Sequence, residues 1–222
     1  MACEVDICEV AHTQVQAGSI NSLSESSKEA QQCLLHYADS RDQVLSETDW
    51  GFNTKVEALA QLSSVTVFNW SYVWTYPTDC LRINSLIRNI EHVSTGDGLA
   101  PAALRHGPSR YRTPRELVPV EYEVLNQDNQ QVIVSNEATL RANYRKRVTD
   151  PNIITVNARQ AISMLLASKI AVPLAGSKEG RTLRTDALSL YNAWLTKAAD
   201  QDANESFQEP QESEYITARE SI

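Results

Sequence analysis

Residues 154–171 read ITVNARQAISMLLASKIA and carry the clearest helical pattern in the chain. Apolar side chains recur there at steps of three and four residues: Ile154, Ala158, Ala161, Ile162, Leu165, Leu166 and Ile170. This spacing places them on one stripe of an α-helix, and such a stripe must pack against other elements to be removed from water. The stretch therefore predicts a helix at the centre of a helical assembly.

The residues on either side predict where this helix begins and ends. We expect Asp150 to be the N-cap and Pro151 the first helical residue, and we expect Pro173 to end the helix. Another helix is predicted from Ser177 to Ala199, with an apolar side of its own. The two would form an antiparallel pair.

Two more helices are predicted near the start of the chain. The first covers residues 5–16 and is followed by Gly18, which favours a left-handed helix cap. The second begins with a capping box formed by Ser26 and Glu29. Its apolar side is predicted to contain Ala30, Cys33, Leu34, Tyr37, Ala38, Arg41, Val44 and Leu45. Helices from both ends of the chain are therefore available to pack together.

The middle of the chain has a different composition, because residues 50–80 are rich in aromatic and β-branched side chains, which favour strands. Within this part, residues 57–62 are a candidate helical segment. Strands are predicted at 81–88, 120–125, 131–134 and 140–148, the second and third paired across a polar turn at 126–129.

These elements predict an α+β fold with a discontinuous antiparallel helix bundle. Residues 1–48 would form its first half and residues 150–200 its second half. A β-rich lobe of residues 49–149 would be inserted between the halves. Residues 201–222 are polar and acidic, and they predict an extended C-terminal tail that does not fold alone.

The 222-residue chain has a formal net charge of −8 and a pI of about 5.1. Six acidic residues and one basic residue lie in the tail, which therefore holds most of the net charge. This balance argues against a protein whose main role is to grip nucleic acid, because duplex binding requires a basic surface. No apolar run is long enough to span a bilayer, and the N-terminal residues do not resemble a secretory signal.

The cysteines and histidines do not predict a metal site. Cysteines occur at positions 3, 8, 33 and 80 without a CxxC pair, and the four histidines have no metal-ligand spacing. Cys8 and Cys33 fall on apolar helix faces, where a free thiol behaves as a small apolar group. We expect reduced thiols and no metal, cofactor or catalytic residue.

Paired carboxylates offer an alternative, a glycan hydrolase associated with a virion. Asp79, Glu121 and Glu123 lie in predicted β segments, and the two glutamates, being two apart, would share one face of a strand. The same spacing suits a solvated strand face. Neither a G-x-S-x-G elbow nor a phosphate-binding loop is present.

Residues 94–119 are rich in glycine and proline and predict an exposed excursion. Four basic residues lie there without nearby acids: Arg105, Arg110, Arg112 and Arg115. They could contact phosphate, or they could dock on an acidic partner or a neighbouring copy of the chain. The negative net charge favours docking.

Several motifs together resemble a known family. They are Ser27-Lys28-Glu29-Ala30, Tyr37, Arg41-Asp42-x-Val44-Leu45, Trp50-Gly51-Phe52-Asn53-x-Lys55 with Leu59 and Leu62, Trp70-x-Tyr72, Tyr76-Pro77-x-Asp79-Cys80-Leu81-Arg82, Thr149-Asp150-Pro151, Lys169-Ile170-Ala171 and Tyr215-Ile216-Thr217-Ala218-Arg219. The chain resembles the head–tail adaptor family of short-tailed bacteriophages, also called tail tubular protein A. The resemblance covers most of the chain outside residues 94–119.

The resemblance implies a structural virion protein, made in the host cytoplasm and located at the head–tail junction. Twelve copies would form a ring that joins the capsid portal to the tail nozzle. Duplex DNA would pass through the ring without sequence-specific binding, during retention and ejection of the genome. The tail would contact the portal, and Tyr215 and Ile216, with Arg219 beside them, are its only apolar anchors in a polar segment. A stand-alone oligomeric interaction module is a further alternative.

Overall fold

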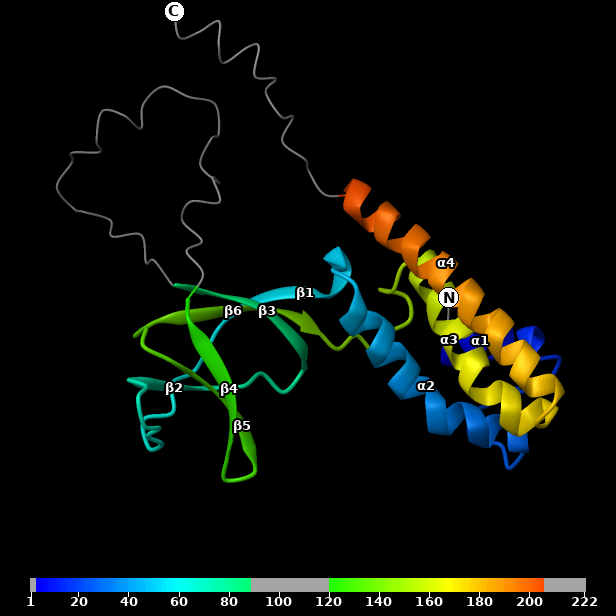
Figure 1. Ribbon diagram of the computed structural model, residues 1–222, viewed down its shortest axis with the longest axis horizontal. Coiled ribbons are helices and arrows are strands. Elements are labelled where there is room, and N and C mark those ends of the chain that lie inside the picture. The colour runs from blue at the N-terminus through cyan, green and yellow to red at the C-terminus, as the bar shows by residue number, and fades with distance from the viewer. Residues whose placement is uncertain (1–2, 89–119, 206–222) are drawn as a thin grey trace, which may run out of the picture. The chain divides into compact units, whose positions relative to one another are not determined.

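The computed structural model describes residues 3–88 and 120–205, and within these ranges the fold is α+β, with four helices and two small antiparallel sheets (Figure 1). The chain divides into two compact units. A helical unit comes from residues 1–52 and 150–222, and a β unit comes from residues 53–149. The predicted fold class is confirmed at this level.

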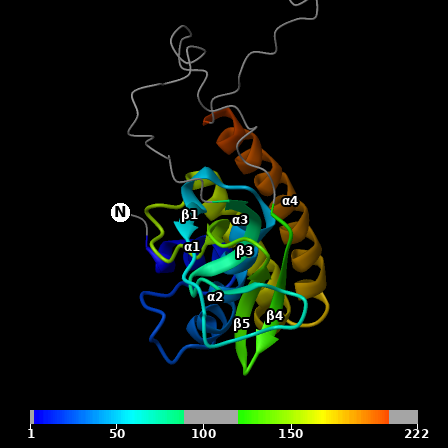
Figure 2. The ribbon, with the colours of Figure 1, turned by 90° about the vertical axis from the view of Figure 1, so that its left-hand side faces the viewer.

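The helical unit is organised around one helix. It contains α1 (Glu4–Gln14), α2 (Lys28–Glu47), α3 (Val156–Ala175) and α4 (Glu179–Glu205), followed in chain order after α2 by a short 3₁₀ turn, Gly51–Asn53. α3 packs against each of the other three helices, and it runs beside α4 (Figure 1, Figure 2). Its side chains are buried around most of its circumference, as the apolar run at 154–171 predicted. No helix in the described ranges is long and apolar enough to cross a membrane.

The N-terminal helices differ from prediction at their caps. Gln16, with a φ of 56°, takes the left-handed conformation that was predicted for Gly18. Ser27, and not Ser26, caps α2, because its hydroxyl accepts a hydrogen bond from the Ala30 amide at 3.3 Å. Leu34 and Ala38, predicted on the buried side, are exposed.

The start of α3 also differs from prediction. Asp150 is not its N-cap, since its carboxylate accepts hydrogen bonds from the Asn152 amide and side chain, both at 2.9 Å, and so closes a local turn. The helix begins only at Val156, after the N-cap Thr155. Proline at position 151 therefore lies in the turn and not in the helix.

Pro173 does not end α3, which continues to Ala175. A proline in the last turn removes only one helical hydrogen bond, so the helix tolerates it. Gly176, with a φ of 84°, ends the helix, and α4 begins at Glu179 and extends past the predicted end at Ala199. A Cβ on Gly180 would lie 2.7 Å from the Ala171 carbonyl oxygen, so the two helices meet closely at this point.

The β unit contains two three-stranded antiparallel sheets. One has the order β1 (Thr54–Ala58), β6 (Leu140–Lys146) and β3 (Cys80–Arg88), and the other has β2 (Tyr72–Thr75), β5 (Gln130–Ser135) and β4 (Tyr122–Gln127). The predicted hairpin is confirmed, with a tighter turn at Asp128 and Asn129. Both turn residues have positive φ, which matches the twist of a two-residue hairpin.

The two sheets share one apolar core. Trp74 and Ile133 come from one sheet, and Leu86, Leu140 and Tyr144 come from the other. A second cluster around Val73, Val132 and Val134 covers the opposite face of the β2–β5–β4 sheet, where residues of the 62–70 segment pack on it.

The candidate helix at 57–62 is wrong. Glu57 and Ala58 belong to β1, and the following residues continue in an extended conformation beside β2. The Leu62 amide donates to the Val73 carbonyl at 2.8 Å, and the Thr75 amide donates to the Ala60 carbonyl at 2.9 Å. Pairing with a strand distant in sequence decided this segment.

Candidate functional site

The residues predicted to contact partners lie outside the described ranges. These are Tyr215, Ile216 and Arg219 in the tail, and Arg105, Arg110, Arg112 and Arg115 in the 94–119 excursion. Their roles stay predictions.

The carboxylates considered for glycan chemistry are not brought together. Glu121 and Glu123 lie at the start of β4 with exposed side chains. Asp79 lies in the turn before β3 and takes part in a different set of contacts. Among the described contacts, none joins either glutamate to Asp79, so the three do not form a paired site.

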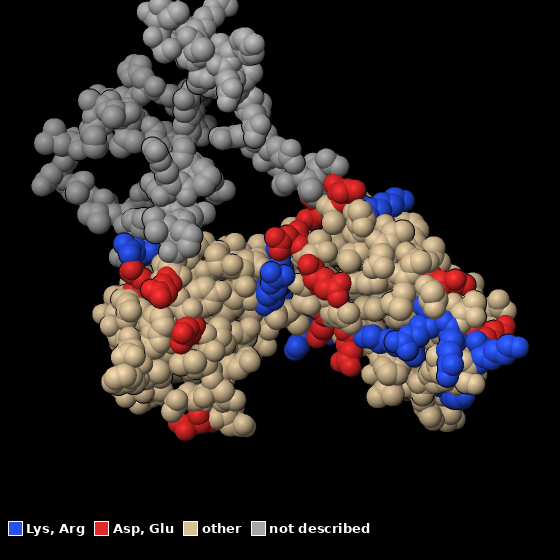
Figure 3. Space-filling model, viewed as in Figure 1, with Lys and Arg blue, Asp and Glu red and all other residues tan. Residues whose placement is uncertain are grey.

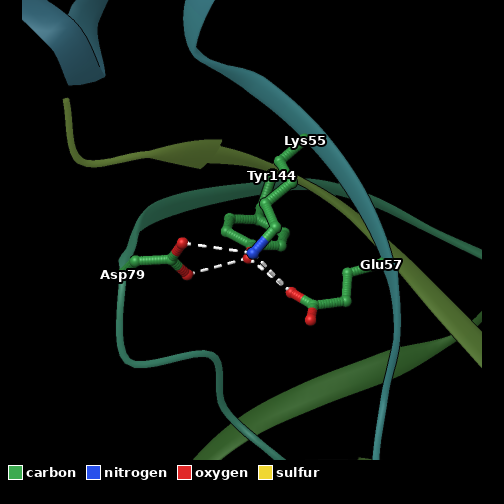
Figure 4. A network of polar contacts seen from close by, with 4 residues as sticks. All are labelled: Lys55, Glu57, Asp79 and Tyr144. Carbon is green, nitrogen blue, oxygen red and sulfur yellow. Dashed lines mark hydrogen bonds and ion pairs between the residues drawn. The ribbon is translucent and has the colours of Figure 1, made fainter.

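Asp79 belongs to a polar network with Lys55, Glu57 and Tyr144 (Figure 4). The Lys55 ammonium lies 2.7 Å from a Glu57 oxygen and 3.3 Å from an Asp79 oxygen. The Tyr144 hydroxyl lies 2.9 Å from Glu57 Oε2 and 2.8 Å from Asp79 Oδ1. The hydroxyl and the ammonium thus lie between the same two carboxylates.

Strand pairing explains how these residues meet. Lys55 on β1 stands directly opposite Tyr144 on β6, and directly opposite residues of an antiparallel pair share a face. Glu57 is two residues beyond Lys55 and shares that face too. The Lys55 ammonium lies 5.6 Å from the centre of the Tyr144 ring. Asp79 is held in place from the other side, because its carbonyl accepts the Arg147 amide at 2.7 Å.

Mutual contacts set the charges of this network. Hydrogen bonds from Lys55 and then Tyr144 lower the pKa of Glu57. Burial works to raise the pKa of Asp79, but hydrogen bonds from Tyr144 and Lys55 outweigh it and keep this pKa below its usual value. The pKa of Lys55 is raised by its contacts with Glu57 and Tyr144. Burial is the main cause of the raised pKa of Tyr144.

A shallow pocket of about 350 Å³ lies beside the network and is lined by Lys55, Glu57, Thr75, Pro77 and Asp79 among others. Catalysis of glycan hydrolysis requires one carboxylic acid that stays protonated near neutral pH. Both carboxylates here are held in the ionised form, and the lysine and tyrosine keep their protons. The arrangement favours a role in joining β1, β6 and the turn before β3.

A second polar cluster lies in the core of the helical unit. His12 and Cys8 are four residues apart on α1, and Cys33 comes from α2; all three are buried. The Cys33 sulfur lies 3.2 Å from His12 Nε2. The other ring nitrogen, Nδ1, has no hydrogen-bond partner in the described part of the chain. The two thiols are free.

The cluster favours charge separation. The Cys8 thiol and then His12 lower the pKa of Cys33 to about 6, against the effect of burial. Contact with Cys33 raises the pKa of His12, and the pKa of Cys8 is raised by Cys33 and by burial. Within the described ranges no group of three histidine, cysteine or acidic side chains has the geometry to hold a metal ion. Complete burial makes this cluster an element of the core.

Apolar side chains also remain on the surface of the helical unit. Leu34 and Leu35 on α2 are 64% and 63% exposed. Ile153 and Val156, at the start of α3, are 50% and 61% exposed. Adjacent exposed leucines on one helix are unusual for a surface that faces only water, whereas single ones are common.

Comparisons with known proteins do not extend this description. A scan against protein-family models found none that matches the chain, and a search of curated proteins found no match.

Sequence reasoning identified Asp79 and missed its partners. Lys55 and Glu57 are two residues apart in a strand-forming stretch, and this is the only local signal that they share a face. Their meeting with Tyr144 depends on the pairing of β1 with β6, which are far apart in the sequence.

Proposed function

We propose that this chain is a structural virion protein, an adaptor ring that joins a capsid portal to a tail nozzle and surrounds part of the DNA exit channel. In this proposal the helical unit is a discontinuous bundle, the β unit is a lobe inserted into it, and residues 201–222 form an extended tail. Twelve copies, the portal and the nozzle are the expected partners.

The observation that carries the proposal is the uncovered apolar surface of the helical unit. Leu34 and Leu35 leave most of their side-chain area in water, although α2 buries its other side against α3. Covering a large apolar side chain contributes about 1.5–3 kcal/mol. A ring provides such cover in every copy, because each copy presents the same surface to a neighbour.

The direct continuation of α4 into the acidic tail supports a partner outside the chain. Ordering a lone peptide costs about 1–2 kcal/mol per residue, so one tail would bind weakly. Many tails that engage one ring act at high effective concentration and bind far better. An acidic chain also suits a DNA channel, since like charge keeps the duplex from adhering to the wall.

The test is reconstitution of the purified chain with the portal ring of the same virus. We expect light scattering to give the mass of a portal that carries about twelve added chains, and negative-stain images to show a capped portal. Replacement of Tyr215 and Ile216 by alanine should abolish capping while circular dichroism stays unchanged.

The matched control replaces Ile153 and Val156 by alanine, which removes similar apolar area far from the tail in sequence. A portal that remains bare with the unaltered chain would reject the adaptor proposal. A defined oligomer of the chain that ignores the portal would favour a stand-alone interaction module, and turnover in a glycan screen would favour the hydrolase.

A further inference from the structure

Four basic side chains gather where α3 turns into α4, and we call this group the basic corner: Lys28, Lys178, Arg181 and Arg184. The Lys28 ammonium donates to the Pro173 carbonyl, which places the start of α2 beside the end of α3. Lys178 follows the turn at Gly176, and the two arginines lie one helical turn apart on α4. Figure 3 shows lysine and arginine side chains gathered over this end of the helical unit.

The basic corner has no anionic partner of its own. None of its four side chains makes an ion pair within residues 3–88 and 120–205. Lys178, Arg181 and Arg184 are exposed. The nearest acids on α4, Glu179 and Asp186, are seven residues apart and share a different side of the helix from the arginines.

The two ends of α4 carry opposite charge. Lys178, Arg181 and Arg184 lie at its start, whereas Asp200 and Asp202 lie near its end. The acidic character then continues beyond the helix at Glu209, Glu212 and Glu214. The chain therefore contains one acidic segment that lies outside the structure and one basic surface that lacks a partner.

We propose that the basic corner of one copy is the docking surface for the acidic stretch, residues 206–214, of another copy. The inference goes beyond the adaptor proposal, because it concerns contact between copies and would hold with any ring partner. It leaves Tyr215 and Ile216 free to contact a different protein.

Reach decides between the same copy and another one. Along α4, Arg181 lies about 36 Å from the end of the helix at 1.5 Å per residue. Residues 206–214 span at most about 32 Å when fully extended. The three glutamates therefore do not reach Arg181 of their own chain. No such limit applies to a neighbouring copy.

The geometry of this contact predicts its symmetry. Each copy offers one acidic stretch and one basic corner at opposite ends of α4, so the contact is head-to-tail. Head-to-tail contacts close into rings when the rotation between copies allows it. Exposed ion pairs are individually weak, so a single contact should be salt-sensitive and a closed ring much more stable.

The test uses a fluorescent peptide of residues 205–222 titrated into the full chain, with anisotropy as the measurement. We expect binding that weakens as sodium chloride is raised. The variant R181E/R184E should bind the peptide about tenfold more weakly, because two attractions become repulsions. The variant R141E/K146E changes net charge equally on exposed residues of β6 and should bind as the unaltered chain does.

Charge exchange gives the decisive result. A peptide with lysine at 209, 212 and 214 should bind R181E/R184E and not the unaltered chain. Equal binding of the original peptide to R181E/R184E and R141E/K146E would overturn the proposal, as would no binding at all. Displacement of the peptide by a short DNA duplex at lower concentration would overturn it in favour of phosphate as the ligand. None of these measurements involves a portal, so the outcome is separate from that of the adaptor proposal.

Discussion

The helical unit and the β unit place their polar groups in opposite ways. In the helical unit, His12 and Cys33 are removed from water and depend on each other. In the β unit, Lys55, Glu57 and Asp79 keep between about a third and half of their side-chain surface in water, and only Tyr144 is buried. A polar contact that is lost in the first unit cannot be replaced by water, whereas one lost in the second can.

The packing of backbones follows the same division. α3 carries alanine and serine at many of its buried positions, which lets neighbouring helices approach closely. The core of the β unit is instead filled by large side chains from two sheets, Trp74, Ile133 and Tyr144 among them. We therefore expect small changes of volume or polarity to be more damaging in the helical unit. Because the two units could unfold separately, each test below follows them separately by hydrogen exchange and mass spectrometry.

The largest effect is expected from Gly180→Ala. The added Cβ would lie 2.7 Å from two backbone atoms of α3, and backbone cannot move aside as a side chain can. We expect a loss of about 3 kcal/mol, the upper part of the range for overpacking, with faster exchange in α3 and α4. Gly18→Ala is the control, since its nearest neighbour is a side-chain tip at 3.9 Å. Equal exchange in the two variants would contradict close helix contact.

The next effect is expected from Cys33→Ala. It leaves His12 Nε2 without its partner, and Nδ1 already has none in the described structure, so the imidazole becomes an unsatisfied buried group. Such groups cost about 1–3 kcal/mol. Cys8→Ala removes a thiol of the same size and burial without taking the partner from His12. A urea titration should place Cys33→Ala clearly below Cys8→Ala, and the reverse order would show that packing alone matters here.

How far the sequence predicts these features depends on the range of the interactions involved. The periodic stretch 154–171 identified α3, because burial on most sides leaves an apolar record in the helix itself. The hairpin of β4 and β5 was predicted because its two strands and its turn are neighbours in the chain. Both results rest on local signals.

Predictions failed where a distant or competing contact took over. Asp150 has the chemistry of an N-cap, but Asn152 supplies a nearer donor and closes a turn instead. The segment 57–62 has a helical composition and is held extended by β2 and β6. Leu34 fits an apolar helix side and is exposed in the single chain, where nothing in the pattern separates a core face from a docking face.

A smaller effect is expected from Tyr144→Phe in the β unit. It removes the hydroxyl that contacts Glu57 and Asp79, but both carboxylates are partly exposed and regain water. We expect a loss of about 1 kcal/mol, the usual net value of one hydrogen bond, seen as faster exchange in β6 and not in α3. Tyr72→Phe on β2 is the control, because its ring is half-buried and its hydroxyl takes no part in the network. A loss larger than that of Cys33→Ala would reverse the comparison between the units.

The smallest effect is expected from acid. The pKa values of Glu57 and Asp79 are lower in the folded protein than their ordinary values of 4.5 and 3.8, so their contacts stabilise the fold above those values. That stabilisation is lost as the pH falls through the lower, folded values. Both groups are largely exposed, so the change is about 0.5 kcal/mol. Hydrogen exchange in β1 and β6 should rise between about pH 5 and pH 3 after correction for the intrinsic rate, and Asp79→Asn should reduce this rise. An equal rise in the variant would mean that the network does not couple the β unit to pH.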